Sequence, residues 1–195
     1  MVMPTLSLPT RSPSPKAFTR AEFIFLADNG FLNDGHYELV QGEIIYKMQN
    51  KPHSVSVMLF TEWIPLCWGC GHTRCQMPID VSPEDNPTSL PEPDVIARAT
   101  PVDVTPNDPP KPSDVELLIE VSDSTLAYDK TTKMGLYARA GIAEYWVADV
   151  VGRTTTAYHA PQGGIYADLR EYGVADTIAP LAKPGASALV GDFFR

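Results

Sequence analysis

The chain has 195 residues, which is enough for one domain with a sizeable core and too few for two comfortable ones. Its hydrophobic fraction of 44% and charged fraction of 20% are those of a folded protein, and no stretch approaches the roughly 18 consecutive apolar residues that a membrane span needs. The net charge of −9 argues against a protein that grips nucleic acid through a broad basic patch, although a bound divalent cation could still meet a phosphate group.

The first segment of the chain, residues 1–16, is rich in proline and serine and has no apolar run. We expect a flexible leader here, followed by a single domain over residues 17–195, and we expect the protein to be cytoplasmic because the leader does not resemble a secretory signal. Thr19 and Glu22 have the spacing of a capping box, so a helix should begin at this point and close near Gly30.

The next elements alternate between short strands and one long helix. Two strands, 37–41 and 43–48, should meet at a tight turn at Gly42. A helix should start near His53 and be kinked or ended by Pro65. Residues 73–81 then predict a strand and residues 93–97 a shorter one, with irregular proline-rich loops over 82–93 and 100–113.

The second half of the chain centres on a strand–helix–strand unit. Residues 115–121 (Val-Glu-Leu-Leu-Ile-Glu-Val) are the most convincing buried strand, and the helix after them should run to Ala140 and stop at Gly141. Strands over 144–150 and 154–159 and a weaker one over 165–172 should follow. The order of elements predicts an α/β (α+β) fold with a mixed sheet.

Three cysteines and a histidine fall within nine residues, at Cys67, Cys70, His72 and Cys75. These are soft metal ligands, but zinc modules usually have a longer loop between their two ligand pairs. We favour ordinary half-buried thiols over a zinc site. An odd number of cysteines in a chain without an export signal also argues against a disulfide framework.

Glu120 is the first candidate for chemistry. It stands at the carboxyl end of the apolar strand, where open α/β sheets place their ligands. Alternation along the strand puts Val115, Leu117, Ile119 and Val121 on one face and Glu120 on the other. A carboxylate there is costly to bury unless it is paired or binds metal. The alternative is a glutamate that points into water from a frayed strand end.

Lys133 makes the first interpretation stronger. Asp129, Lys133, Leu136, Tyr137 and Ala140 have the spacing of one helix face, so Lys133 should lie on the apolar, inward side of its helix. The alternative is an exposed Asp129–Lys133 ion pair, which would not require apolar residues beside it.

A third carboxylate, Asp94, follows Pro93 at the start of a short apolar strand, with 25 residues between it and Glu120. The order Pro93-Asp94, Glu120 and a nearby lysine resembles the PD-(D/E)XK nuclease superfamily. Longer runs over residues 18–158 resemble the Uma-type restriction endonucleases. The runs are Tyr37-Glu38-Leu39-Val40-Gln41-Gly42-Glu43-Ile44, Pro52-His53, Glu120-Val121-Ser122-Asp123-Ser124-Thr125, Asp129-x-x-x-Lys133-x-x-x-Tyr137-Ala138-Arg139-Ala140-Gly141-Ile142 and Glu144-Tyr145-Trp146-Val147.

The resemblance implies a restriction-endonuclease-like core, with a central mixed sheet flanked by helices, and a carboxylate-based site for Mg²⁺ or Mn²⁺. Asp94 and Glu120 would bind the metal, with the Val121 carbonyl as a further ligand, and Glu38 matches the family's upstream acidic residue. Ser122 occupies the usual place of the superfamily lysine, whose role would pass to Lys133. His53 also matches a family position, but as a helix-start histidine it could equally be a polar cap.

The function that this implies is metal-dependent endonucleolytic hydrolysis of nucleic acid, DNA in the first instance. Cutting two strands would suit a homodimer, but the sequence itself does not show one. Two other interpretations stay open: an inactive family member that serves as a binding module, and a phosphohydrolase of small substrates. The basic residues nearest the site in sequence are Arg98, Lys111, Lys130 and Arg139. If these do not border the site, long DNA becomes a poorer substrate.

Overall fold

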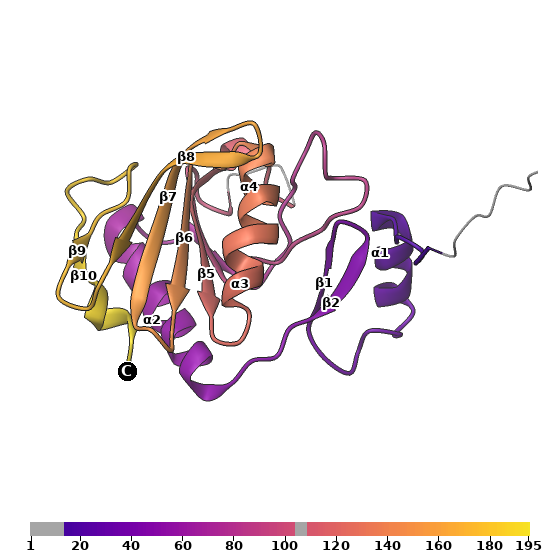
Figure 1. The fold of residues 1–195 in the computed structure, drawn as a ribbon, viewed down its shortest axis with the longest axis horizontal. Helices are drawn as coiled ribbons and strands as arrows, with labels where there is room; N and C mark the ends of the chain where they lie inside the picture. Colours follow the sequence, from indigo (N-terminus) through magenta and orange to yellow (C-terminus); the bar gives the residue numbers. More distant parts are fainter. Residues whose placement is uncertain (1–13, 104–108) are drawn as a thin grey trace, which may run out of the picture.

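The computed structural model describes residues 14–103 and 109–195, so most of the expected leader, residues 1–13, lies outside the described part of the chain. Its centre is a six-stranded sheet in the order β3-β4-β5-β6-β7-β8 (Figure 1). The strands are Thr73–Cys75, Val95–Arg98, Val115–Ser122, Glu144–Asp149, Thr154–Gln162 and Ile165–Tyr172. Only β5 and β6 run parallel to each other, so the sheet is mixed, as the sequence predicts.

Helices cover both faces of this sheet. The helix α2 (Lys51–Trp68) packs on one face, and the helical unit after β5 packs on the other (Figure 1). That unit consists of α3 (Leu126–Tyr128), a π-helical turn η2 (Asp129–Lys133) and α4 (Met134–Ala140). It ends at Gly141, whose φ of 78° is the left-handed conformation that closes many helices. The expected fold class, a mixed sheet flanked by helices, is confirmed. In the part of the chain that the structure describes, no helix has the length and apolar character needed to cross a membrane.

Alternation along β5 separates two cores. Leu117, Ile119 and Val121 contribute to the core beneath α2, while Leu118 contributes to the core beneath α4. Val115 departs from the expected pattern and lies in the α4 core, because the ladder between β4 and β5 is irregular at Ala97 and Arg98. A bulge of this kind changes the face on which the following side chains lie.

Two expected elements differ from the observed ones. The strand predicted over residues 73–81 stops at Cys75, because Gln76 takes a left-handed φ of 49° and Pro78 has no N–H to donate to a ladder. Ile79 and Val81 are nevertheless fully buried, as irregular chain in the α4 core. Pro65 does not end α2, which continues for one more turn to Trp68.

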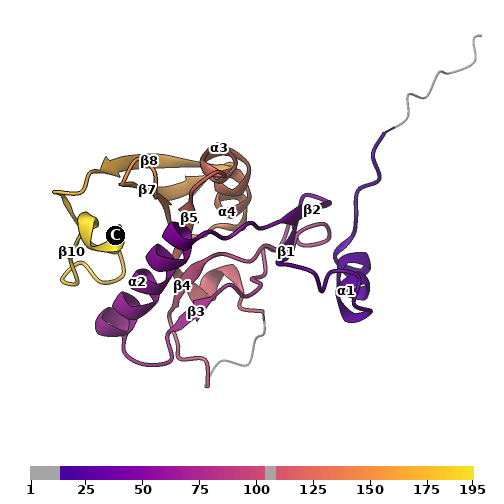
Figure 2. The ribbon, with the colours of Figure 1, turned by 90° about the horizontal axis from the view of Figure 1, so that it is seen from below.

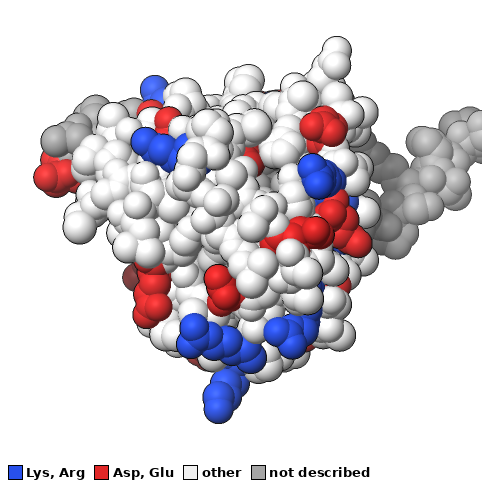
Figure 3. Space-filling view, turned by 90° about the vertical axis from the view of Figure 1, so that its left-hand side faces the viewer, with Lys and Arg blue, Asp and Glu red and all other residues white. Residues whose placement is uncertain are grey.

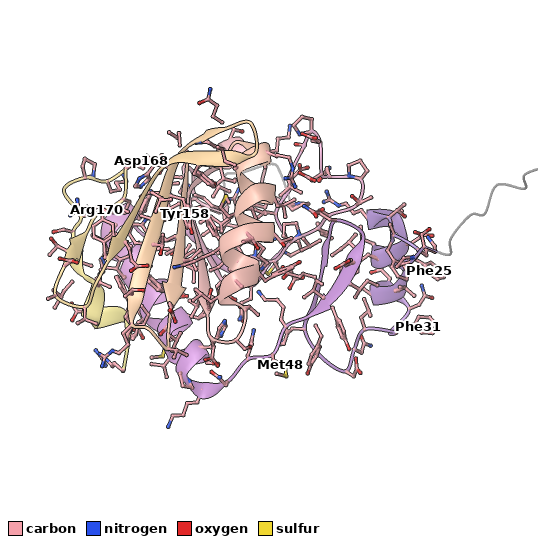
Figure 4. The ribbon with its side chains drawn as sticks, viewed as in Figure 1. Phe25, Phe31, Met48, Tyr158, Asp168 and Arg170 are labelled. Carbon is pink, nitrogen blue, oxygen red and sulfur yellow. The ribbon has the colours of Figure 1, made fainter. Side chains whose placement is uncertain are left out.

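A small unit stands at one end of the molecule (Figures 1 and 2). It consists of α1 (Arg20–Asp28), which carries the predicted capping box, and the hairpin of β1 (Tyr37–Val40) and β2 (Glu43–Tyr46). The hairpin forms its own two-stranded sheet. Phe25 and Phe31 project from the outer side of this unit and are 61% and 68% exposed (Figure 4).

The C-terminal segment closes the opposite end of the molecule. It comprises β9 (Thr177–Ile178), β10 (Ala188–Leu189) and the 3-10 turn η3 (Val190–Phe193), none of which the sequence predicted. Another short 3-10 turn that the sequence did not predict, η1 (Pro112–Asp114), lies before β5. Glu144 of β6 ties this segment to the sheet. Its fully buried carboxylate accepts hydrogen bonds from Trp146 Nε1 at 2.8 Å, from the Leu181 amide at 2.7 Å and from His159 Nε2 at 3.1 Å.

The contact between His159 and Glu144 predicts that stability depends on pH. The hydrogen bond to Glu144 raises the pKa of His159, against the opposing effect of partial burial. The protonated histidine therefore stabilises the fold fully below its unfolded pKa, and this contribution is lost as the pH rises through the higher folded pKa. We expect wild type to lose more stability between pH 6 and pH 8.5 than His159→Gln does, measured by urea denaturation. Equal losses in the two proteins would contradict this.

Candidate active site

The sequence-predicted site residues meet in one pocket between the hairpin and the sheet. Glu38 comes from β1, His53 from the first turn of α2, Asp94 from the residue before β4, Glu120 and Val121 from β5, and Lys133 from η2. The pocket has a volume of about 40 Å³. That is room for a few waters or one hydrated ion, and far less than the several hundred Å³ of a typical small-ligand pocket.

Lys133 bridges two carboxylates at the base of the pocket. Its Nζ lies 2.9 Å from Glu38 Oε1 and 2.8 Å from Glu120 Oε1, and Lys133 is only 2% exposed. The Tyr137 hydroxyl also donates to Glu120 Oε1, at 2.7 Å. Both alternatives for these residues, a water-facing Glu120 and an exposed Asp129–Lys133 pair, are therefore wrong.

The π-helical turn positions Lys133. Asp129 does not pair directly with Lys133 and instead accepts hydrogen bonds from the hydroxyls of Ser122 and Thr125, at 2.7 and 2.6 Å. The Tyr145 hydroxyl donates to the Asp129 main-chain carbonyl at 3.1 Å. These contacts fix the turn against the end of β5, and a π turn in place of regular α-helix is frequent at functional sites.

Asp94 forms the second half of the network. Its Oδ1 lies 3.1 Å from Lys47 Nζ, and its Oδ2 accepts the Val121 N–H at 2.9 Å and lies 3.2 Å from His53 Nε2. His53 is therefore not the cap of α2, because the Asn50 side chain caps that helix. The role of the Val121 carbonyl stays a prediction.

Burial and charge act in opposite directions on the three central ionisable groups. Burial raises the pKa of Glu120 to about 8, although Lys133 works against the shift. The pKa of Asp94 is held well below its ordinary value, because Lys47 and His53 outweigh the cost of burial. Burial disfavours the charged form of Lys133, but Glu120 and Glu38 keep its pKa well above the ordinary value. A further cation in the pocket would favour the ionised form of Glu120.

The donor chemistry fits a hard divalent cation, since Glu38, Asp94 and Glu120 offer only carboxylate oxygens. The ammonium groups of Lys47 and Lys133 now stand where such a cation would meet these oxygens. Within residues 14–103 and 109–195, no three histidine, cysteine or acidic side chains are arranged so as to hold a metal ion. In this structure the carboxylate oxygens are paired with the ammonium groups of Lys47 and Lys133 instead.

The cysteine–histidine cluster shows no sign of a metal site in the same described residues. All three cysteines are free thiols; Cys67 lies in α2, and Cys70 and Cys75 are exposed. The His72 ring is engaged through Nδ1 with the Arg98 main-chain oxygen at 2.8 Å.

The four basic residues that lie nearest to the predicted site residues in the sequence do not line the pocket. Arg98 is buried at 1% exposure, Arg139 pairs with Asp85 at 2.7 Å, and Lys130 lies 3.5 Å from Glu171, while Lys111 is exposed elsewhere. On the face in Figure 3, basic and acidic side chains are interspersed among wide uncharged areas. The basic groups that do line the pocket are Lys47 and Lys133.

Sequence reasoning missed Lys47 and the role of Tyr137. Lys47 follows β2 directly, between Tyr46 and Met48, and nothing in this local sequence signals that the hairpin will fold over Asp94. Tyr137 was placed on the inward face of its helix, but its contact with Glu120 depends on how α4 packs against β5.

Comparison with known proteins shows a solved structure with a similar fold and the family to which the chain belongs. The fold matches a crystal structure described as "a putative nuclease belonging to DUF820" from Anabaena variabilis ATCC 29413, with a TM-score of 0.69 and 16% sequence identity, over 91% of this chain and 97% of that one. The chain belongs to the Uma2 family, whose description is "Putative restriction endonuclease" and whose model matches residues 20–190. No curated protein matches the sequence.

Proposed function

We propose that this protein is a divalent-metal-dependent endonuclease that hydrolyses phosphodiester bonds, with DNA as its substrate and Mg²⁺ or Mn²⁺ as its cofactor. The observation that carries the proposal is the buried pocket in which Lys133 bridges Glu38 and Glu120 while Asp94 stands beside them. Buried charges of this density are costly for stability and cluster at functional sites. The family membership supports nuclease chemistry as well.

Each residue has a task in this proposal. Asp94, Glu120 and Glu38 would hold the cation, which supplies a polarised phosphoryl oxygen and a hydroxide nucleophile at neutral pH. The Lys133 ammonium would stabilise the negative charge that grows on the phosphate oxygens during attack. The Tyr137 hydroxyl orients Glu120 through its 2.7 Å hydrogen bond. Cleavage of two strands would suit a homodimer, with one pocket for each strand.

A second candidate is a metal-dependent phosphohydrolase of small substrates. It is favoured by the absence of Arg98, Lys111, Lys130 and Arg139 from the lining of the pocket. The volume of about 40 Å³ counts against it, because such a pocket can receive a phosphate group but cannot enclose a whole small molecule. A phosphate site of this small volume suits a substrate that lies across the surface, so we place the nuclease first.

The test is cleavage of plasmid and single-stranded DNA with Mg²⁺ or Mn²⁺. We expect metal-dependent cutting by wild type and its loss in Glu120→Ala and Lys133→Ala. The matched control is Glu116→Ala, since Glu116 lies on the same strand but contacts Trp68 of α2, away from the pocket. No cutting by a wild-type protein that binds metal would favour a small phosphorylated substrate. No cutting and no metal binding would favour an inactive binding module.

A further inference from the structure

Lys47 and Lys133 are both lysines of the pocket, but they differ in how they are held. Lys133 is 2% exposed at the base and contacts two carboxylates. Lys47 has a side-chain exposure of 12% and contacts one carboxylate oxygen, Asp94 Oδ1, together with the Glu92 main-chain oxygen at 2.6 Å. Lys47 is therefore the outer ammonium, with a route to solvent, and Lys133 is the enclosed one.

The other oxygen of Asp94 is already committed to fixed partners. The Val121 N–H belongs to the sheet and His53 belongs to the first turn of α2, so Oδ2 is held by rigid elements. Only Oδ1 faces a flexible partner, the four-carbon side chain of Lys47. A cation that binds Asp94 from the open side of the pocket must meet this oxygen, and two cations on one oxygen repel each other strongly at low dielectric constant.

We propose that Lys47 is a positioning residue that occupies the cation's place at Asp94 when no metal is bound, so that a divalent cation binds only by displacing the Lys47 ammonium. This inference rests on the proposed metal-dependent function. The backbone of Lys47 stays in place, because its N–H donates to the His36 carbonyl at 2.8 Å. Release thus needs rotation of the side chain toward the pocket mouth, which breaks the contacts of Nζ with Asp94 Oδ1 and with the Glu92 main-chain oxygen. Lys47 keeps the buried Asp94 neutralised before metal arrives and sets the metal concentration at which the site loads.

The test is a calorimetric titration with Mn²⁺ of wild type, Lys47→Met and Lys47→Arg. The control is Lys51→Met, which makes the same chemical change at an exposed position on the first turn of α2. We expect Lys47→Met to bind Mn²⁺ about tenfold more tightly than wild type, since a competing charge is removed. Lys47→Arg should stay close to wild type or bind more weakly, and Lys51→Met should match wild type. A residue with a purely structural role would weaken metal binding when removed.

Thermal unfolding gives a second readout that needs no activity. Without metal, Lys47→Met should melt several degrees below wild type, because Asp94 loses a buried partner. Added Mn²⁺ should raise the melting temperature more in Lys47→Met than in wild type.

The outcomes separate this inference from the proposed function. Cleavage of DNA by wild type with Mn²⁺, together with unchanged or weaker metal affinity in Lys47→Met, would overturn the displacement of Lys47 and leave the nuclease proposal standing. No Mn²⁺ binding by either protein would overturn both. Binding by Lys47→Met where wild type shows none would support the displacement, even if neither protein cuts DNA.

Discussion

Asp94→Asn is expected to abolish both divalent-metal binding and DNA cleavage, while Lys133→Met abolishes cleavage and leaves metal binding in place. The reason is the division of tasks in the proposed function: the Asp94 carboxylate would bind the cation, whereas the Lys133 ammonium can offer only positive charge to the substrate. A lost donor to a developing negative charge typically lowers kcat by about 100- to 1000-fold. Single-turnover cleavage and calorimetric Mn²⁺ titration should be run on the same preparations.

The folded state of both variants must be checked, because each leaves a charged group of a buried network without its partner. Circular dichroism below the melting temperature of each variant provides that check. Full metal-dependent cleavage by Asp94→Asn would remove the carboxylate site from the mechanism. Loss of metal binding in Lys133→Met, in a protein shown to be folded, would mean that Lys133 builds the site and would contradict its separate role.

Glu144→Ala is expected to lower the free energy of unfolding by about 3–5 kcal/mol, because the substitution leaves the donors of Trp146, Leu181 and His159 without their acceptor. For a chain of this size, that corresponds to roughly a 10 °C fall in melting temperature. Chemical denaturation and thermal melting both measure it. No effect is expected on metal affinity at temperatures where the variant is folded, since Glu144 does not line the pocket.

Glu171→Ala is the matched control for this prediction. Glu171 lies on β8 of the same sheet, but its side chain is 58% exposed and its contact with Lys130, at 3.5 Å, is a surface ion pair. Such pairs contribute about 0–1 kcal/mol. If Glu144→Ala were no more destabilising than Glu171→Ala, the attachment of the C-terminal segment would have to rest on its apolar contacts and on other hydrogen bonds, such as the one from Arg153 to the Phe194 main-chain oxygen at 3.0 Å.

Local patterns in the sequence predicted those site residues whose orientation is set within a single strand or a single helix. Alternation along residues 115–121 placed Glu120 opposite the α2 core, and helical spacing placed Lys133 on an inward face. The resemblance to a known family added Glu38, which no local pattern distinguishes from other strand residues, and singled out His53 and Asp94 from ordinary cap and turn residues. The fold brings all three to the same pocket. Their roles in metal binding stay predictions.

Features that depend on how distant segments pack were not predictable in the same way. Lys47 meets Asp94 across 47 positions of the chain, and no spacing rule links the two. Glu144 belongs to one of the runs that carry the family resemblance, yet it lies away from the pocket. There it accepts a hydrogen bond from a C-terminal segment whose strands are two residues long. The length of the strand predicted over residues 73–81 was overestimated, because the apolar residues after Cys75 are buried as irregular chain and do not pair with a neighbouring strand.

The separation of the β1–β2 hairpin from the main sheet has a kinetic consequence. Glu38 and Lys47 are carried by this hairpin. Among the residues that the structure describes, its ladder joins its own two strands, and its main-chain bonds from Leu39 and Gly42 go to Leu90 and Thr88 of a loop rather than to the central sheet. Small units of this kind open independently of the rest of a protein. Amide hydrogen exchange in the hairpin should therefore be faster than exchange in β5 and β6, and it should slow when a divalent cation joins the hairpin to the sheet through Glu38. The hairpin amides thus report the assembly of the site without a substrate.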